Sequence, residues 1–322
     1  MAKQIPSIQQ VRQILGQYSI APIRNWLKRV ELPHTMNSRD EMVEKVHKLL
    51  ESGAITEDGL IEVSIGIEEA SSKRTFLYRI PHTAKDLATI DQQIADLKLP
   101  LSPERTPSVA PTMTPKLVYL MNDSSSLRAK WNEQHIRITP DKRTQTFSNT
   151  NHPKTIVLVV NKKTGDVQLR YDKPDDKHMH TVDNEPSDDA YFKSYTEKAE
   201  NMLGLPLEPI DLRPGLENVL KTEPRIVRTN YTIDDAEDGA HTKRTQKKTG
   251  KDIRDTGEWK RISKDTTIRT FEEAPLTWLP KMSNGMLQRE MFSYVDAANG
   301  FVRFDADCDE GEIDYVLSKL VP

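Results

Sequence analysis

Apolar side chains recur at the three- and four-residue spacing of an amphipathic helix in three consecutive segments near the start of the chain. This spacing predicts helices over about residues 7–18, 22–30 and 38–53. Ser38 and Glu41 have the spacing of a capping box at the start of the third helix, and Gly53 is suited to end it. The chain therefore begins with a small helical unit.

The pattern changes to alternation after residue 58. Apolar residues occupy every second position over residues 59–69, and a second alternating run follows over 75–80. A period of two is typical of strands with one buried face, so these runs predict a small hairpin that closes the helical unit. Residues 83–98 return to helical spacing and predict a further helix.

A proline-rich stretch follows this helix and divides the chain. Its prolines stand at near-regular intervals among serine, threonine and alanine, as Pro100, Pro103, Pro107, Pro111 and Pro115. Such a composition is typical of a semi-extended tether between domains. We therefore expect an N-terminal domain over residues 1–98, a linker over 99–115 and a second domain over 116–322.

Strand-like and helix-like segments follow one another in the second domain, which predicts an antiparallel sheet and the α+β class. Strands at 155–160 and 166–171 form a hairpin in which Gly165 supplies a positive φ angle. Further strands are predicted at 116–121, 135–138, 225–233, 290–295 and 301–305. Helices are predicted at 188–203, at 215–220 and at the C-terminus. Acidic and then basic residues over 234–257 predict a long charged loop.

The composition excludes some classes of protein. Mean hydropathy is −0.66, and no apolar run approaches the length needed to span a bilayer. The N-terminus lacks the apolar core of a signal peptide, and the single cysteine, Cys308, cannot form an internal disulfide. We therefore expect an intracellular protein with no membrane partner.

A formal net charge of −3 argues against nucleic-acid binding by the whole surface, so any such contact requires a local basic patch. Basic residues gather on the polar faces of the second and third helices, in the 161–165 turn and in the charged loop. The candidate phosphate contacts are Arg24, Lys28, Arg29, Arg39, Lys45, Lys48, Lys162, Lys163, Lys243, Arg244, Lys247 and Lys248.

Two patterns have some of the features of a metal site. His178 and His180 would point to one face of a strand, but a zinc site needs further ligands. Asp305, Asp307 and Asp309 begin like a calcium loop that lacks its closing glutamate, and capping of the last helix explains them better. We expect no metal and no cofactor.

One pattern keeps an enzyme as the alternative. Glu258 and Lys260 have the spacing of half of a metal-dependent nuclease site, without a convincing partner aspartate on a preceding strand. The sequence has no glycine-rich phosphate loop and no nucleophile elbow. We therefore expect a non-enzymatic binding protein. The alternatives are a metal-dependent nuclease or other nucleic-acid-processing or defence protein, and a protein-binding scaffold.

The end of the chain offers a candidate surface for a protein partner. Phe301, Val302 and Phe304 alternate on a terminal strand, which predicts an exposed sheet edge. Such an edge would join a related subunit or a second copy of the chain. The alternative is that these residues complete the core of their own domain.

The order of these segments resembles known proteins. The predicted helix over 22–30, the extended loop after it and the predicted helix over 38–53 resemble the SAP and pyrin-like modules of nucleic-acid and chromatin proteins. Nearly the whole chain resembles the centromere protein N family in layout, with the segments RDEMVEKVHKLLESG, FLYRI, KTIVLVV and GFVRFDADCDEGEIDYVLSKL.

The resemblance implies a function. Members of that family are non-enzymatic adaptors of the inner kinetochore that hold duplex DNA beside a nucleosome and pair with a related subunit. For this chain it implies DNA or a nucleosome as a partner, and the nucleus and chromosome as its location in place of the cytoplasm. Family members tend to be basic, whereas this chain has an isoelectric point near 6.3, which puts tight duplex binding in doubt.

Overall fold

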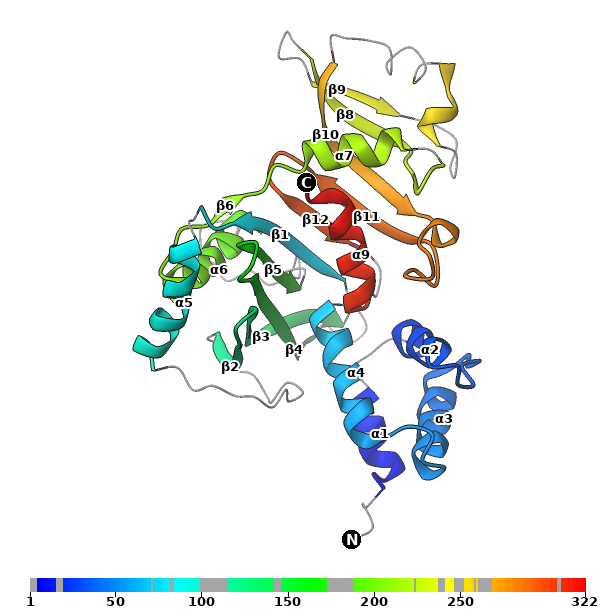
Figure 1. The fold of residues 1–322 in the computed structure, drawn as a ribbon. Coiled ribbons are helices and arrows are strands. Elements are labelled where there is room, and N and C mark those ends of the chain that lie inside the picture. The colour runs from blue at the N-terminus through cyan, green and yellow to red at the C-terminus, as the bar shows by residue number, and fades with distance from the viewer. Residues whose placement is uncertain are drawn as a thin grey trace.

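The computed structural model contains a helical unit and one large antiparallel sheet with covering helices, which confirms the α+β class (Figure 1). It describes residues 5–15, 20–70, 72–81, 84–98, 115–141, 146–172, 188–222, 224–236, 241–245, 252–257, 259, 268–305 and 308–322.

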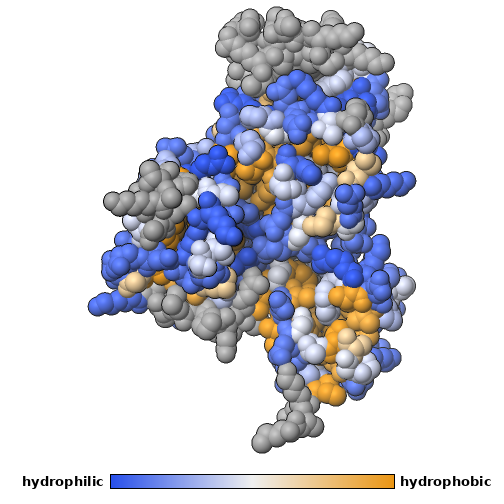
Figure 2. All heavy atoms as spheres, in the orientation of Figure 1, coloured by the Kyte–Doolittle hydropathy of each residue, from blue (hydrophilic) through white to orange (hydrophobic). Residues whose placement is uncertain are grey.

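The helical unit forms the start of the chain and packs around one apolar core. Its helices are α1 (Ile8–Leu15), α2 (Ile20–Arg29), α3 (Arg39–Glu51) and α4 (Glu57–Ala70). The predicted start of α3 is confirmed, because Ser38 Oγ accepts a hydrogen bond from the backbone N–H of Glu41. Apolar residues also reach the surface of this unit, at the lower right of Figure 2, and Val30 is among the exposed ones.

The strand predicted over residues 59–69 is wrong, because this segment lies within helix α4. Thr56 Oγ1 accepts the backbone N–H of Gly59, and acidic residues occupy the first turn, as is typical of a helix start. Alternation appeared in the sequence because α4 is buried on two sides. Leu60 and Ile67 pack in the helical core, whereas Glu69 and Ala70 are buried toward the sheet.

Over the described residues the sheet has 12 strands. Ten follow the order β2-β3-β4-β5-β1-β12-β11-β10-β8-β9, β6 pairs with β1, and β7 pairs with β10. The strands are β1 (Lys73–Arg79), β2 (Lys116–Asn122), β3 (Ser126–Asp141), β4 (Thr146–Asn161), β5 (Asp166–Asp172), β6 (Glu208–Pro209), β7 (Val227–Arg228), β8 (Tyr231–Ala236), β9 (His241–Thr245), β10 (Ile268–Trp278), β11 (Met291–Asp296) and β12 (Phe301–Phe304). The predicted hairpin at Gly165 is confirmed as β4 and β5, and Gly165 has a φ of 75°.

The first strand along the chain lies in the middle of the sheet. β1 pairs with β5 on one side and with β12 on the other. The segment predicted as an N-terminal domain, residues 1–98, therefore contributes a central strand to the sheet, and the helical unit ends with α4. The predicted linker at 99–115 lies almost wholly outside the described residues.

Helices cover both faces of the sheet (Figure 1). Helices α5 (Ala84–Asp96) and α6 (Asp188–Leu203) form an apolar core with strands β1 to β5. Helices α7 (Arg213–Lys221) and α9 (Glu310–Leu320) pack on the other face, over β10, β11 and β12. The 3-10 turns are η1 (Ile253–Asp255) and η2 (Pro280–Met282).

The charged loop predicted over residues 234–257 is wrong in part. β8 continues to Ala236, β9 pairs with it, and η1 follows. The adjoining strand β10, which the sequence pattern did not predict, lies between β8 and β11. The segment HTKRT of β9 carries no hydrophobic alternation, so the period of two on which the prediction depends is missing.

Helices α7 and α9 approach each other closely at Gly215. A Cβ atom at this position would lie 1.9 Å from the carbonyl oxygen of Leu320. This oxygen belongs to the backbone of α9, so it cannot move aside as the end of a flexible side chain could. A side chain here therefore requires the two helices to separate.

We expect Gly215→Ala to lower the free energy of unfolding by about 1–3 kcal/mol or more, through this overpacking. The matched control is Gly66→Ala in α4, where a Cβ meets no atom within 4 Å. That control should raise stability by about 0.5–1 kcal/mol, because alanine favours the helix. Urea denaturation of both variants checks the pair, and equal effects would contradict the packing argument.

Candidate functional site

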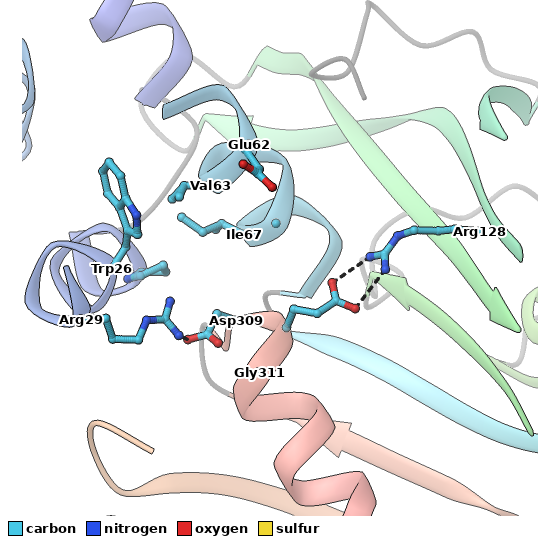
Figure 3. Close-up of a pocket in the computed structure, with 11 residues that line it drawn as sticks. Trp26, Arg29, Glu62, Val63, Ile67, Arg128, Asp309 and Gly311 are labelled. Carbon is cyan, nitrogen blue, oxygen red and sulfur yellow. Dashed lines mark hydrogen bonds and ion pairs between the residues drawn. The ribbon is translucent and has the colours of Figure 1, made fainter. Parts of the chain in front are cut away.

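A groove of about 440 Å³ lies where the helical unit meets the sheet (Figure 3). It brings together α2, α4, β3 and the start of α9, which are far apart in the sequence. Its apolar side is made by helices α2 and α4, and charged side chains lie toward α9. The lining residues are Pro22, Trp26, Arg29, Glu62, Val63, Gly66, Ile67, Arg128, Asp309, Glu310 and Gly311.

An ion pair closes one end of the groove. Arg29 of α2 lies 2.7 Å from Asp309, which is also the N-cap of α9 (Figure 3). The Asp309 carboxylate accepts the backbone N–H of Glu312, and the Glu312 carboxylate accepts that of Asp309, so the two form a capping box. Arg29 was predicted to contact phosphate, but its charge is compensated here by a carboxylate.

The buried member of this capping box holds a proton more tightly than an exposed glutamate. Glu312 is 1% exposed. Burial raises its pKa to about 7, and the nearby charge of Asp309 acts in the same direction. The Glu312 carboxyl therefore changes its protonation near neutral pH.

Arg128 of β3 lines the other side of the groove. Its guanidinium donates to Glu69 of α4, at 2.9 Å from Nε, and to both carboxylate oxygens of Glu310, at 3.0 and 2.8 Å. Arg170 of β5 also donates to Glu310, at 2.9 Å. Burial alone would raise the pKa of Glu310, but Arg170 and Arg128 lower it to about 2.

Further ion pairs extend this network across the same face of the sheet. Lys130 of β3 lies 3.0 Å from Glu68 of α4. Lys73 of β1 lies 2.6 Å from Asp172 of β5. Thr155 of β4 donates to Glu68 at 2.8 Å and links the two pairs. The joint between helix α4 and the sheet is therefore polar, although it is buried.

The network is suited to holding elements together. Its basic side chains Lys73, Arg128, Lys130 and Arg170 each have a carboxylate partner. In the part of the chain that the structure describes, no group of three or more histidine, cysteine, aspartate or glutamate side chains could hold a metal ion. The groove offers an apolar surface between charged ends.

Two predicted basic residues meet at the loop between α2 and α3. Arg24 donates to the carbonyl oxygen of Met36 at 2.6 Å, and Lys45 donates to that of Thr35. A carbonyl oxygen carries no net charge, so both side chains remain net cations at this point. The other predicted residues exposed on these two helices are Lys28, Arg39 and Lys48.

The remaining predicted basic residues follow the helical unit along the sequence. Lys162, in the turn between β4 and β5, lies 2.5 Å from Asp91, and its hydrogen bond lowers the pKa of that carboxyl. Lys163 is exposed in the same turn. The others are Lys243 and Arg244, whose backbone forms β9, and Lys247 and Lys248, which lie outside the described residues.

The predicted partner edge is wrong. Strand β12, which carries Phe301, Val302 and Phe304, is paired with β1 on one side and β11 on the other. Val302 and Phe304 are buried in the core beneath α9. The pattern of the strand was identified correctly, but the partner on its second side comes from residues 73–79, which sequence spacing does not reveal. Among the strands that the structure describes, the path of pairs ends at β2 and β9.

The other chemical patterns gain no support. His178 and His180 lie outside the described residues, as do Glu258, Lys260 and Asp307. Asp309 is confirmed as the cap of the last helix.

The sequence did not single out the residues of the ion network. Glu69, Arg128, Arg170 and Glu310 come from four elements distant in sequence, the helices α4 and α9 and the strands β3 and β5, so no local spacing joins them. One signal was present in β3, where Arg128 and Lys130 alternate with Leu127 and Ala129. That alternation indicates a polar face, which would ordinarily be assigned to solvent.

No protein-family model matches the sequence, and a search of curated proteins gives no match. Among the described residues, no helix combines the length and the apolar character needed to cross a membrane.

We expect Arg128→Met to lower the free energy of unfolding by about 3–5 kcal/mol, because it leaves the fully buried Glu69 without its main partner. The control is Arg79→Met, which removes an ion pair whose arginine is 46% exposed. That exposed pair contributes about 0–1 kcal/mol. Chemical denaturation of both variants measures the difference, and a small effect of Arg128→Met would show that the network does not hold α4.

We expect stability to fall as pH rises from 5 to 8, because the folded pKa of Glu312, about 7, lies above that of an unfolded glutamate. The favourable contribution of the neutral carboxyl is complete below the unfolded pKa and is lost as pH rises through the folded one. Glu312→Gln should reduce the difference in unfolding free energy between pH 5 and pH 8 by at most about 3 kcal/mol. Urea midpoints at the two pH values test this, and identical slopes in both proteins would contradict it.

Proposed function

We propose that this chain is a non-enzymatic adaptor that contacts the backbone of a nucleic acid through basic side chains of α2 and α3. The observation that supports the proposal is the convergence of Arg24 and Lys45 on the loop between these helices. The layout that resembles the centromere protein N family favours duplex DNA, beside a nucleosome, as the nucleic acid. Such a function would place the protein on the chromosome.

The geometry suits phosphate better than base edges. Arg24 and Lys45 are each anchored by a backbone carbonyl oxygen, which holds two cations near one point without neutralising them. Lys28 follows Arg24 by one helical turn on the exposed side of α2. A short row of cations of this kind binds phosphates electrostatically and carries no sequence information.

The same proposal includes a protein partner for the sheet. Because β12 is paired on both sides, a related subunit or a second copy would join at an end of the path, at β2 or β9. Backbone groups on the outer side of an end strand are those that can extend a sheet across an interface.

We expect binding to duplex DNA that weakens steeply with salt and depends little on sequence. Lys28→Ala and Lys45→Ala should each reduce the slope of log affinity against log salt by about 1, because each removes one phosphate contact. Fluorescence anisotropy with two unrelated duplexes at several salt concentrations measures both effects.

The matched control is Lys221→Ala, which removes an exposed lysine from α7, on the sheet. It should leave the slope unchanged. Absence of duplex binding at low salt would overturn the proposal and favour a protein-binding scaffold.

A further inference from the structure

A second cavity, of about 600 Å³, lies on the opposite face of the sheet from the ion network. Side chains of β1 alternate between the two faces of the sheet. Lys73 belongs to the ion network on one face, and Arg74 and Phe76 line the cavity on the other. A cavity of this volume is within the range that holds small-molecule ligands.

Strand pairing arranges the floor of this cavity in rows. Arg74 of β1 lies opposite Arg303 of β12. Two residues along, Phe76 of β1 lies opposite Phe301 of β12. Successive rows on one face are about 7 Å apart, because the strand rises about 3.3 Å per residue. A basic row therefore stands beside an aromatic row.

A third aromatic ring, from helix α6, packs on the aromatic row. Phe192 of α6 stacks on Phe76, with ring centroids 3.4 Å apart and planes inclined by 21°. The Phe301 ring lies 4.7 Å from that of Phe76 and is tilted by 42°. Phe301 is only partly buried, and it lines the cavity. Flat rings in this arrangement offer a stacking surface for another planar ring.

The basic row places two like charges opposite each other, which by itself destabilises a pair of strands. Arg303 is held by Asp305, through Nε at 2.9 Å and one terminal nitrogen at 3.0 Å. It also lies over the ring of Tyr294, 5.1 Å from the centroid. Arginine has further N–H donors on its second terminal nitrogen, so this fixed guanidinium is suited to bind an anionic group beside Arg74.

The cavity also carries hydrogen-bonding groups of another kind, beside the aromatic row. Asp296 of β11 lies opposite Phe301, and Asn299 follows in the turn between β11 and β12. The Asn299 amide donates to Asp296 at 2.9 Å, which fixes the carboxylate. A carboxylate at this place is an acceptor for an amino group on a bound ring.

We infer that this cavity binds a nucleotide with an amino-bearing base. The base stacks on Phe301, its amino group faces Asp296, and its phosphate meets Arg74 and Arg303. The nucleotide is either free or part of a single strand, since both present the same ring and the same anion. This site goes beyond the proposed function, because it lies on the sheet and not on α2 and α3.

Calorimetric titration with four probes tests the inference. AMP carries the ring and the anion, adenosine carries only the ring, inorganic phosphate carries only the anion, and a short oligodeoxyadenylate carries bases within a strand. We expect AMP to bind more tightly than adenosine or phosphate. A tighter complex with the oligonucleotide than with AMP would identify a single strand as the source, and the reverse would identify a free nucleotide.

Two variants test the named contacts. Phe301→Leu keeps an apolar side chain but removes the ring, and Arg303→Gln removes the charge; each should weaken AMP binding at least about fivefold. The control is Phe292→Ala, which removes an exposed phenylalanine on β11 that does not line the cavity. It should leave AMP affinity unchanged, and thermal melting of all variants checks that they fold.

Some results would overturn the inference. These are no binding of AMP or the oligonucleotide at millimolar concentration, equal affinity for AMP and adenosine, or unchanged AMP binding by folded Phe301→Leu. Lys28→Ala and Lys45→Ala should not alter AMP binding. The failure of duplex binding and the failure of nucleotide binding are therefore separate outcomes.

Discussion

The buried pairing of Arg128 with Glu69 and Glu310 is the interaction on which the arrangement of this molecule depends. It joins a strand of the sheet, the last turn of the helical unit and the start of the final helix. Removing such charges from water is costly, and the cost is offset only when each charge keeps its partners in good geometry. The ion network therefore tolerates little change in how α4 and α9 lie on the sheet.

Strand β1 connects this network to the rest of the molecule. One of its faces contributes Lys73 to the ion network, and the other contributes Arg74 and Phe76 to the aromatic cavity. Because β1 lies between β5 and β12, an early segment of the sequence is also hydrogen-bonded to a late one. A displacement of this strand would disturb both the joint with the helical unit and the proposed nucleotide site.

The proposed binding surfaces differ in how they are supported. The cations at the loop between α2 and α3 are anchored by backbone carbonyl oxygens of that loop, within one small helical unit. The aromatic cavity instead requires β1, β12, β11 and α6 to be assembled first. We therefore regard the first as a local feature of sequence and the second as a product of sheet assembly.

The sequence by itself determined the features that depend on neighbouring residues: the capped helix α3, the Gly165 hairpin, the Asp309 cap and the α+β class. Their signals are short-range, since caps and turns need particular residues at fixed offsets. Only the tertiary structure decided that residues 59–69 are helical, that β12 is an interior strand and that Arg128 faces Glu69 and Glu310. Each of these depends on a partner many residues away, and alternation or charge in one segment does not specify which distant segment will cover it.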